Sequence, residues 1–177
     1  MATELIHFTK LTEPTAEITA VFNKWENDPA LVPFTRPSQD QAALDTPQIV
    51  TAATLRQRLE HDVIYLIHRG AELIGEMNYQ IDPAHVYKKE AGTGWIGITI
   101  GEESARGQGI GNLAIAHLEA EIKKAGLKRI ELGVFEFNEN ALKLYTRLGY
   151  QRTGVIDDFT YWRGKMWRDI RMEKYMS

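Results

Sequence analysis

Residues 95–126 read WIGITIGEESARGQGIGNLAIAHLEAEIKKAG. The first six residues are apolar or small, which is typical of a buried strand. A glycine-rich turn follows, and residues 110–125 carry apolar side chains at the spacing of an amphipathic helix. Residues 129–135, 139–148 and 150–155 continue as strand, helix and strand. This β-α-β-α-β order predicts a mixed α/β domain with a central sheet.

The residues on either side of this section add strands and one long irregular segment. The remaining predicted elements are strands at 4–12, 63–68, 73–81 and 166–172 and helices at 17–25 and 54–61. Residues 28–47 hold four of the six prolines, so we expect an irregular loop or a broken helix there. Loops of this length inside compact domains are often functional.

The turn Arg106-Gly107-Gln108-Gly109-Ile110-Gly111 is the sharpest local feature. Glycines at alternate positions let the backbone turn tightly and bring its N–H groups close to a ligand. The helix that follows begins with unpaired N–H groups and the positive end of its dipole, an arrangement that suits a phosphate. Arg106 adds a fixed positive charge beside the turn.

Three phosphate ligands compete for this turn. A P-loop needs Lys-Ser/Thr after its last glycine, and Asn112-Leu113 stand there instead, which excludes that motif. A dinucleotide fingerprint would need a glycine where Asn112 stands. The turn also lies in mid-chain and not in an opening βαβ unit, so this motif is disfavoured. The third ligand is the pyrophosphate of coenzyme A. A plain tight turn without a ligand is the structural alternative.

Composition limits the classes of protein to consider. The 177 residues include 44% hydrophobic and 25% charged side chains, the mix of a soluble globular domain. No apolar run approaches the roughly 20 residues needed to span a bilayer, and the first residues, MATELIHFTKL, show no secretory signal. We therefore expect a cytoplasmic protein. The absence of Cys excludes disulfides and thiolate nucleophiles.

The net charge of −3 argues against nucleic acid as a partner, because a nucleic-acid binder needs a concentrated basic face. The charge is unevenly spread: residues 1–88 hold 12 acidic and 7 basic side chains, and residues 89–177 hold 12 and 14. This split is either surface decoration or the mark of an anionic ligand meeting a cationic one. The five histidines show no ligand spacing, so we expect no metal.

The stretch from Trp95 to Tyr150 resembles the acyl-CoA-binding core of the GNAT superfamily of N-acetyltransferases. The family's Arg/Gln-x-x-Gly-x-Gly/Ala pattern is matched by Arg106, Gly109 and Gly111. A second segment, NENALKLYTRLGY at 138–150, resembles the family's N-x-x-A-x-x-L-Y-x-x-x-G-F, with Tyr150 in the usual Phe place. The first 90 residues carry no comparable motif. The chain is loosely similar to the branch that acts on ribosomal-protein N-termini and polyamines.

The resemblance implies a single acyltransferase domain over residues 1–177, with a mixed, mainly antiparallel sheet of six to seven strands and about four helices. It implies acetyl-CoA as co-substrate, with the strand end at 98–100 binding the pantetheine arm and the turn binding the pyrophosphate. Asn138 is either a helix N-cap, a contact of the CoA arm, or both. The implied cofactor-binding residues are Ile98, Thr99, Ile100, Arg106, Gly107, Gln108, Gly109, Ile110, Gly111, Asn112 and Asn138.

Tyr145 is the residue expected to take part in the chemistry. Attack by an amine expels a thiolate that needs a proton, and a tyrosine close to the sulfur can supply it as a general acid. The alternative is that Tyr145, level with Ala141 and Leu148 on its helix, is a core aromatic.

The general base is open at this point. Relatives that use a glutamate on the preceding strand carry it five residues before Asn138, and here that residue is Gly133. Glu76, Glu131 and Glu102 are candidates, each with a structural or solvated alternative, and ordered water is a fourth. Freeing an amine of pKa about 10.4 at pH 7 costs about 4.6 kcal/mol, against about 1.4 for an α-amine of pKa near 8. A site without a strong base would suit the α-amine better.

The function implied is transfer of acetyl from acetyl-CoA to a primary amine of a small molecule or a protein N-terminus. Without Cys, the transfer is expected to proceed by direct attack in a ternary complex. The alternative functions are a non-catalytic acyl-CoA-binding or sensing domain and a nucleotide- or nucleic-acid-binding module. By family position, residues 28–50 and 157–167 would border the acceptor. Acidic residues there that could attract a cation are Asp28, Asp40, Asp45, Asp157 and Asp158. The aromatic and basic stretch 161–168 is expected to form the substrate-side hairpin or a homodimer contact.

Overall fold

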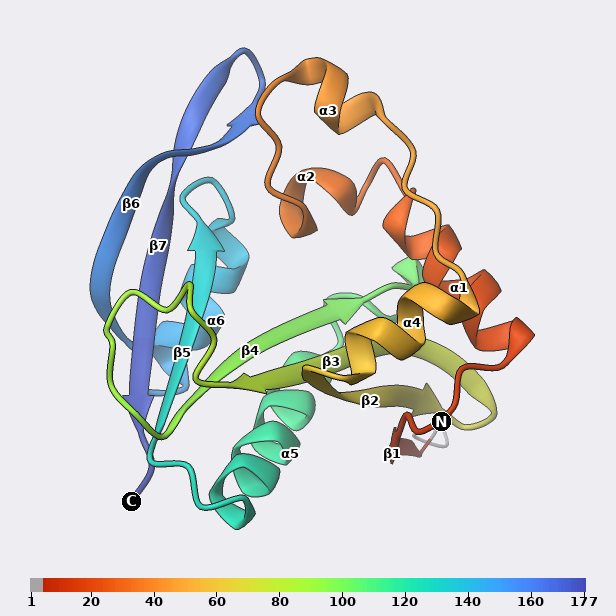
Figure 1. Cartoon of the computed structure of the whole chain (residues 1–177), viewed down its shortest axis with the longest axis horizontal. Coiled ribbons are helices and arrows are strands. Elements are labelled where there is room, and N and C mark those ends of the chain that lie inside the picture. Colours follow the sequence, from red (N-terminus) through yellow and green to blue (C-terminus); the bar gives the residue numbers. More distant parts are fainter. Residues whose placement is uncertain (1–4) are drawn as a thin grey trace.

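The structure, a computed structural model, describes residues 5–177 and contains one seven-stranded sheet (Figure 1). The strands are β1 (Ile6–Lys10), β2 (Asp62–Arg69), β3 (Glu72–Ile81), β4 (Thr93–Ile100), β5 (Arg129–Phe135), β6 (Gln151–Trp162) and β7 (Lys165–Tyr175). Their order is β1-β2-β3-β4-β5-β7-β6, and every neighbouring pair is antiparallel except β4 and β5. The predicted mixed, mainly antiparallel sheet is confirmed. Glu4, the first residue of the predicted strand at 4–12, lies outside the described residues.

Six α-helices and one short 3-10 turn accompany the sheet within residues 5–177. They are α1 (Ala16–Glu26), α2 (Val32–Thr35), α3 (Gln41–Asp45), α4 (Ala52–Leu59), α5 (Ile110–Lys124), α6 (Glu139–Arg147) and η1 (Glu103–Ala105). The two helices beyond the expected four, α2 and α3, lie in the proline-rich segment. Pro33 sits in the first turn of α2, where a missing N–H costs nothing, and the Asp40 side chain caps α3. None of these helices combines the length and apolar character that crossing a bilayer requires.

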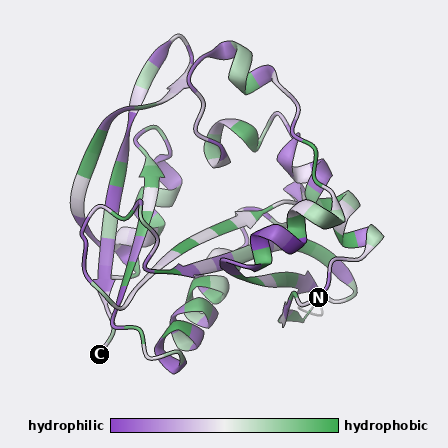
Figure 2. Cartoon of the chain, in the orientation of Figure 1, coloured by the Kyte–Doolittle hydropathy of each residue, from purple (hydrophilic) through white to green (hydrophobic). Residues whose placement is uncertain are grey.

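Helices pack on both faces of the sheet because the strands are buried on both sides. On β2, Tyr65 and Ile67 belong to the core beneath α5, whereas Ile64 and Leu66 belong to a second core beneath α1 and α4. Figure 2 shows hydrophobic and hydrophilic residues interspersed along the helices, as expected where one side of a helix packs on the sheet and the other faces solvent. Full burial of each such aliphatic side chain stabilises the fold by about 1.5 to 3 kcal/mol.

The sheet splits between β4 and β5. These parallel strands pair only where Thr93 to Trp95 meet Arg129 to Glu131. Beyond that point the two strands run apart (Figure 1). Among residues 5–177, the edges of β4 and β5 that face each other past the split therefore have no strand partner, and their backbone groups stay available for a ligand.

A buried ionic network closes the narrow end of the split. Arg129 and Glu131 are fully buried and lie 2.7 Å apart. Glu131 also accepts hydrogen bonds from the backbone N–H groups of Tyr87 (2.7 Å) and Lys88 (3.1 Å) and from Arg171 Nη1 (3.2 Å). Burial alone would raise the pKa of Glu131, but these donors outweigh it and lower the pKa. Glu131 thus fastens the β3–β4 loop to the sheet as a carboxylate.

Candidate active site

A cavity of about 520 Å³ occupies the split between β4 and β5. Its walls come from β3, β4, β5 and α6, and residues of α2 and β6 lie opposite. The cavity gathers segments far apart in sequence, including Thr35 and Pro37 from the proline-rich segment and Phe159 from β6. The predicted border residues 28–50 and 157–167 thus both contribute to it.

The end of β4 presents backbone to this cavity. Ile98, Thr99 and Ile100 line it, and their antiparallel partners on β3 are Met77, Glu76 and Gly75. On the other side of β4 no strand pairs with these three residues among residues 5–177. This free edge can bind an extended amide-bearing arm and can direct an N–H toward a carbonyl oxygen that gains negative charge.

The glycine-rich turn lies at the same end of β4 and begins α5. Gly107 (φ +71°) and Gly109 (φ +76°) adopt the left-handed conformation that glycine favours, and Gly109 is the N-cap of α5. No side chain of residues 5–177 caps this helix, so its first N–H groups remain free. Gly111 borders the cavity against Leu144, and Asn112 lies beside Gly109. An open helix start beside the free edge of β4 fits a pyrophosphate joined to a pantetheine arm.

Two side chains of the turn bind backbone carbonyls. Arg106 donates from Nε to the Ile100 oxygen (3.1 Å) and from Nη2 to the Gly101 oxygen (2.9 Å), and Gln108 donates to the Ser104 oxygen. Arg106 therefore holds the turn against the end of β4 in this structure. Direct contact of its guanidinium with a phosphate stays a prediction.

α6 contributes Asn138 and Tyr145 to the cavity wall. Asn138 is the N-cap of α6, and its Oδ1 accepts a hydrogen bond from the Ala141 N–H (3.4 Å), so the capping role is present. Tyr145 is 7% exposed and packs edge-on against Tyr150, with ring centroids 5.6 Å apart. Tyr145 is thus both a core aromatic and a cavity residue, and its hydroxyl makes no hydrogen bond within residues 5–177. Burial raises the pKa of Tyr145, which is already well above neutral pH for an ordinary phenol, so the hydroxyl is protonated at neutral pH.

Of the three glutamates considered as bases, Glu76 alone lines the cavity. Its two oxygens accept hydrogen bonds from Arg58 Nη2 at 3.0 and 3.1 Å. Glu131 lies in the buried network described above. Glu102 lies outside the cavity and pairs with Lys24 (2.9 Å) and the Trp25 indole (3.0 Å), and the hydrogen bond from Lys24 lowers its pKa.

Two further carboxylates line the cavity, and sequence reasoning missed both. Glu26 ends α1, and burial together with the charge of Glu76 raises its pKa. Asp169 on β7 is 2% exposed, and burial raises its pKa against the opposing effect of Arg171. No local pattern marks either residue, because each reaches the cavity through tertiary pairing.

None of the five aspartates expected near the acceptor lines this cavity. Asp28 lies 3.7 Å from Arg106, Asp40 caps α3, and Asp45 pairs with Gln41. Asp157 and Asp158 are exposed on β6.

Aromatic rings form part of the cavity wall. Phe34, Trp95, Phe135 and Phe159 line it. Phe34, itself 40% exposed, continues the wall outward by packing against Phe137 (5.6 Å) and Trp162 (5.4 Å). The aromatic residues of the stretch 161–168 therefore extend the cavity wall toward the tip of the β6–β7 hairpin.

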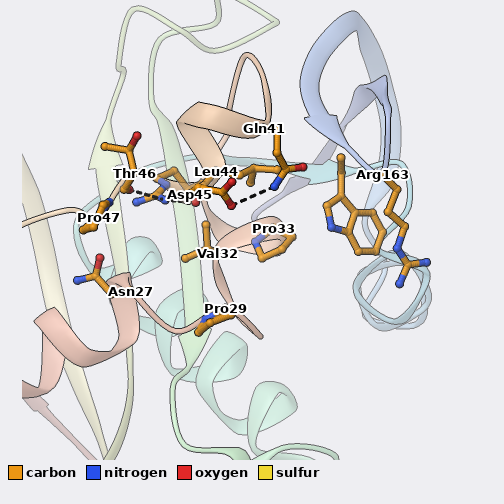
Figure 3. A pocket seen from close by; sticks show the side chains of 12 residues that line it. Asn27, Pro29, Val32, Pro33, Gln41, Leu44, Asp45, Thr46, Pro47 and Arg163 are labelled. Atoms are coloured by element: carbon orange, nitrogen blue, oxygen red, sulfur yellow. Dashed lines mark hydrogen bonds between the residues drawn. The ribbon is translucent and has the colours of Figure 1, made fainter.

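A second cavity of about 480 Å³ lies between the proline-rich segment and that hairpin tip (Figure 3). α2 separates the two cavities, since Phe34 and Thr35 face the first and Val32 and Pro33 the second. Arg36 Nη2 donates to the carbonyls of Leu44 (3.0 Å) and Thr46 (3.2 Å), which ties α3 to the end of α2. Within residues 5–177 no group of His, Asp or Glu has the arrangement of a metal site.

Comparison with known proteins agrees with this geometry. The family model described as "Acetyltransferase (GNAT) family" matches residues 19–150. The chain is 34% identical over 95 residues to the spermine/spermidine N(1)-acetyltransferase of Bacillus subtilis (strain 168), covering 51% of this chain and 60% of that one. It is 34% identical over 84 residues to the uncharacterized N-acetyltransferase YdgE of the same strain, covering 48% and 51%. The matches thus span about half to three fifths of these curated relatives.

Solved structures share the fold over nearly the whole chain. The GNAT-family acetyltransferase from Streptococcus pneumoniae superimposes with a TM-score of 0.76 at 18% identity, covering 98% of this chain and 100% of that one. The spermidine N-acetyltransferase from Vibrio cholerae, in complex with CoA and spermine, superimposes with a TM-score of 0.73 at 16% identity, covering 96% and 95%. At these identities the two structures establish a common fold.

Proposed function

Because the chain belongs to the acetyltransferase (GNAT) family, we propose that it transfers the acetyl group of acetyl-CoA to a primary amine by direct attack in a ternary complex. The observation that carries the proposal is the cavity between β4 and β5. There the free edge of β4, the buried phenol of Tyr145 and several carboxylates meet in one space. The open start of α5 lies at the same end of β4.

Each part of the cavity has a task in this reaction. Acetyl-CoA, when bound, supplies the acetyl group as a thioester. The N–H groups on the free edge of β4 would hold the pantetheine arm and polarise the thioester carbonyl, and residues 106–112 would bind the pyrophosphate. The phenol of Tyr145, which is protonated at neutral pH, would give its proton to the departing sulfur.

Composition and the site both support direct attack. The chain has no Cys, so the acetyl group cannot pass through an enzyme thioester. The acceptor amine and the thioester must therefore lie in the cavity together. A non-catalytic acyl-CoA sensor would need the turn at 106–111 but would have no use for a phenol in the cavity wall.

We propose that the acceptor is an aliphatic polyamine and not a peptide N-terminus. Glu26 and Glu76 bring negative charge to one side of the cavity, and Phe34, Trp95 and Phe159 bring aromatic faces to the other. Carboxylates and aromatic faces both attract ammonium groups. The similarity to the spermine/spermidine N(1)-acetyltransferase of Bacillus subtilis also favours a polyamine. A homodimer contact through the β6–β7 hairpin stays a prediction.

A CoA-release assay over a panel of amines tests the proposal. The panel holds spermidine, spermine, aminoglycosides, free amino acids and peptides with free N-termini. We expect release of CoA with at least one primary amine and no release with the matching N-acetylated amine. Tight binding of acetyl-CoA without transfer to any amine would instead support the sensing domain.

A further inference from the structure

On the premise of the acetyl transfer proposed above, we infer that Asp169 is the general base that accepts the proton of the acceptor amine. The feature that points to it is the relation between Asp169 on β7 and Gly133 on β5. Both residues line the cavity, and β5 and β7 are neighbours in the sheet.

The carboxylate of Asp169 occupies the space in which a side chain of residue 133 would lie. A Cβ on Gly133 would stand 2.6 Å from Asp169 Oδ2 and 3.1 Å from the Trp95 ring. The first of these distances is too short for a real contact, so a side chain at position 133 would displace the Asp169 carboxylate. Position 133 is where the family resemblance places the glutamate of those relatives that use one on this strand. Here the glycine leaves that space empty, and the neighbouring strand fills it with a carboxylate.

The register of the sheet explains how the side chain reaches this place. Asp169 pairs with Phe135 and Arg171 pairs with Gly133, so Asp169 is the diagonal neighbour of Gly133 on the same face. Arg171 Nε holds Asp169 Oδ2 at 2.8 Å. Arg171 is itself fixed by Glu131 (3.2 Å) and by the His85 carbonyl (2.9 Å). Oδ1 of Asp169 has no hydrogen-bond partner among residues 5–177 and is free to accept a proton.

The groups around Asp169 set its charge. On its own strand the guanidinium of Arg171 favours the carboxylate, and on β5 Glu131 disfavours it. From the β3–β4 loop comes His85, whose pKa is lowered by burial and by Arg171, so its ring is neutral near pH 7. The aromatic neighbours Trp95 and Phe159 carry no charge. Burial leaves the pKa of Asp169 raised overall, which brings it nearer to the working pH of a general base.

The other two carboxylates of the cavity suit a different task. Both oxygens of Glu76 already accept hydrogen bonds from Arg58 Nη2. Glu26 lies at the end of α1, and although its place in the cavity wall raises its pKa, the residue keeps an exposed surface that solvent can reach. These two can attract a cation, whereas Asp169, a residue that is only 2% exposed, offers a carboxylate oxygen without a hydrogen-bond partner among residues 5–177.

A single proton moves from the amine to Asp169 in this step. One N–H bond of the bound ammonium breaks, an O–H bond forms on Asp169, and the electron pair left on nitrogen becomes available for attack. Asp169 then returns the proton to solvent. At pH 7 an amine of pKa about 10.4 is unprotonated in only about one molecule in 2,500, so a base inside the cavity has a large effect.

The test is the pH dependence of kcat/KM for the wild type, Asp169→Asn and Glu17→Gln, with spermidine as acceptor or the best amine of the panel if that is another. Glu17→Gln removes an exposed carboxylate of α1 and is expected to match the wild type. We expect Asp169→Asn to lower kcat/KM about 100-fold at pH 7 while acetyl-CoA binding stays within threefold. The loss should shrink as the pH approaches the pKa of the amine, because free amine then needs no base. A purely structural role would give the same loss at every pH.

A second variant decides the matter if Asp169→Asn does not fold. Gly133→Ala retains both members of the Asp169–Arg171 pair but places a methyl group in the space of the carboxylate, and we expect at least a tenfold loss at pH 7. If the wild type transfers acetyl, three results overturn the inference but leave the proposed function standing. These are an Asp169→Asn loss under threefold, a loss that is independent of pH, and a Gly133→Ala variant with unchanged activity. A wild type that acetylates no amine overturns the proposed function, and the inference with it.

Discussion

Arg58 holds Glu76 at the wall of the cavity through two hydrogen bonds of 3.0 and 3.1 Å. The same guanidinium binds Asp62 through Nε at 2.9 Å, so one cation serves two largely buried carboxylates. Arg58 comes from α4, Asp62 from β2 and Glu76 from β3. The Arg58–Glu76 pair therefore joins α4, which covers the sheet, to β3, which lines the cavity.

Replacing Arg58 with Gln should destabilise the protein by about 2 to 4 kcal/mol, because it leaves two carboxylates buried without their cation. The measurement is chemical unfolding of the wild type, Arg58→Gln, Glu76→Gln and the double variant. The double variant should be less destabilised than the sum of the single ones, since an uncharged amide at position 76 needs no cation. Strictly additive effects would show that the two residues do not stabilise each other.

Replacing Tyr145 with Phe should lower kcat by about 100-fold and leave the affinity for acetyl-CoA within threefold, because only the proton donor is lost. The hydroxyl has no hydrogen-bond partner within residues 5–177, so little stability should be lost with it. Tyr65→Phe is the matched control, since Tyr65 is also buried but packs in the core beneath α5. The measurements are steady-state kinetics, with the acetyl-transfer step confirmed as rate-limiting, and calorimetric binding. Unchanged turnover of Tyr145→Phe would leave Tyr145 with its packing role alone.

Replacing Gly109 with Ala should weaken acetyl-CoA binding by at least tenfold. Gly109 has a φ of +76° at the start of α5, where a side chain strains the backbone and blocks close approach of a phosphate. Gly126→Ala is the control, because Gly126 has a φ of +82° just after the other end of the same helix. Both variants should lose about 1 to 2 kcal/mol of stability, but affinity should fall for Gly109→Ala alone. Equal affinities in a calorimetric titration would place the pyrophosphate elsewhere.

The part of the site next to the glycine-rich turn was predictable because it is local. The strand at 129–135 has the predicted bounds, and the predicted helix at 110–125 ends within one residue of α5. Backbone conformation and helix start are properties of consecutive residues, so a motif such as Arg106 to Gly111 carries them. The long irregular segment was predicted, but not that Pro33 would start a helix within it.

The acidic side of the site was not predictable from the sequence. Asp169 meets Gly133 because β7 inserts between β5 and β6, an order that adjacency in the sequence does not suggest. Glu26 meets Glu76 because α1 and β3 border the same cavity, although 50 residues separate them in the chain. The contact of Asp169 with Gly133 depends on strand order and register, and a shift of one residue in β7 would turn its carboxylate to the other face.

Replacing Glu131 with Gln should cost about 3 to 5 kcal/mol of stability at pH 7, because Arg129 and Arg171 would be left buried with fewer acceptors. The pKa of Glu131 is lowered in the folded protein, so its stabilising effect is full above the unfolded pKa of about 4.3. It is lost as the pH falls from that value through the lower folded pKa. Wild-type Tm should therefore drop steeply below about pH 4.3, whereas Glu131→Gln should start lower and fall less. Glu136→Gln is the control, since Glu136 also has a lowered pKa but pairs with Arg168 at the surface, where an ion pair contributes little to stability. If the two variants show the same Tm at pH 7, the buried network does not hold the narrow end of the split together.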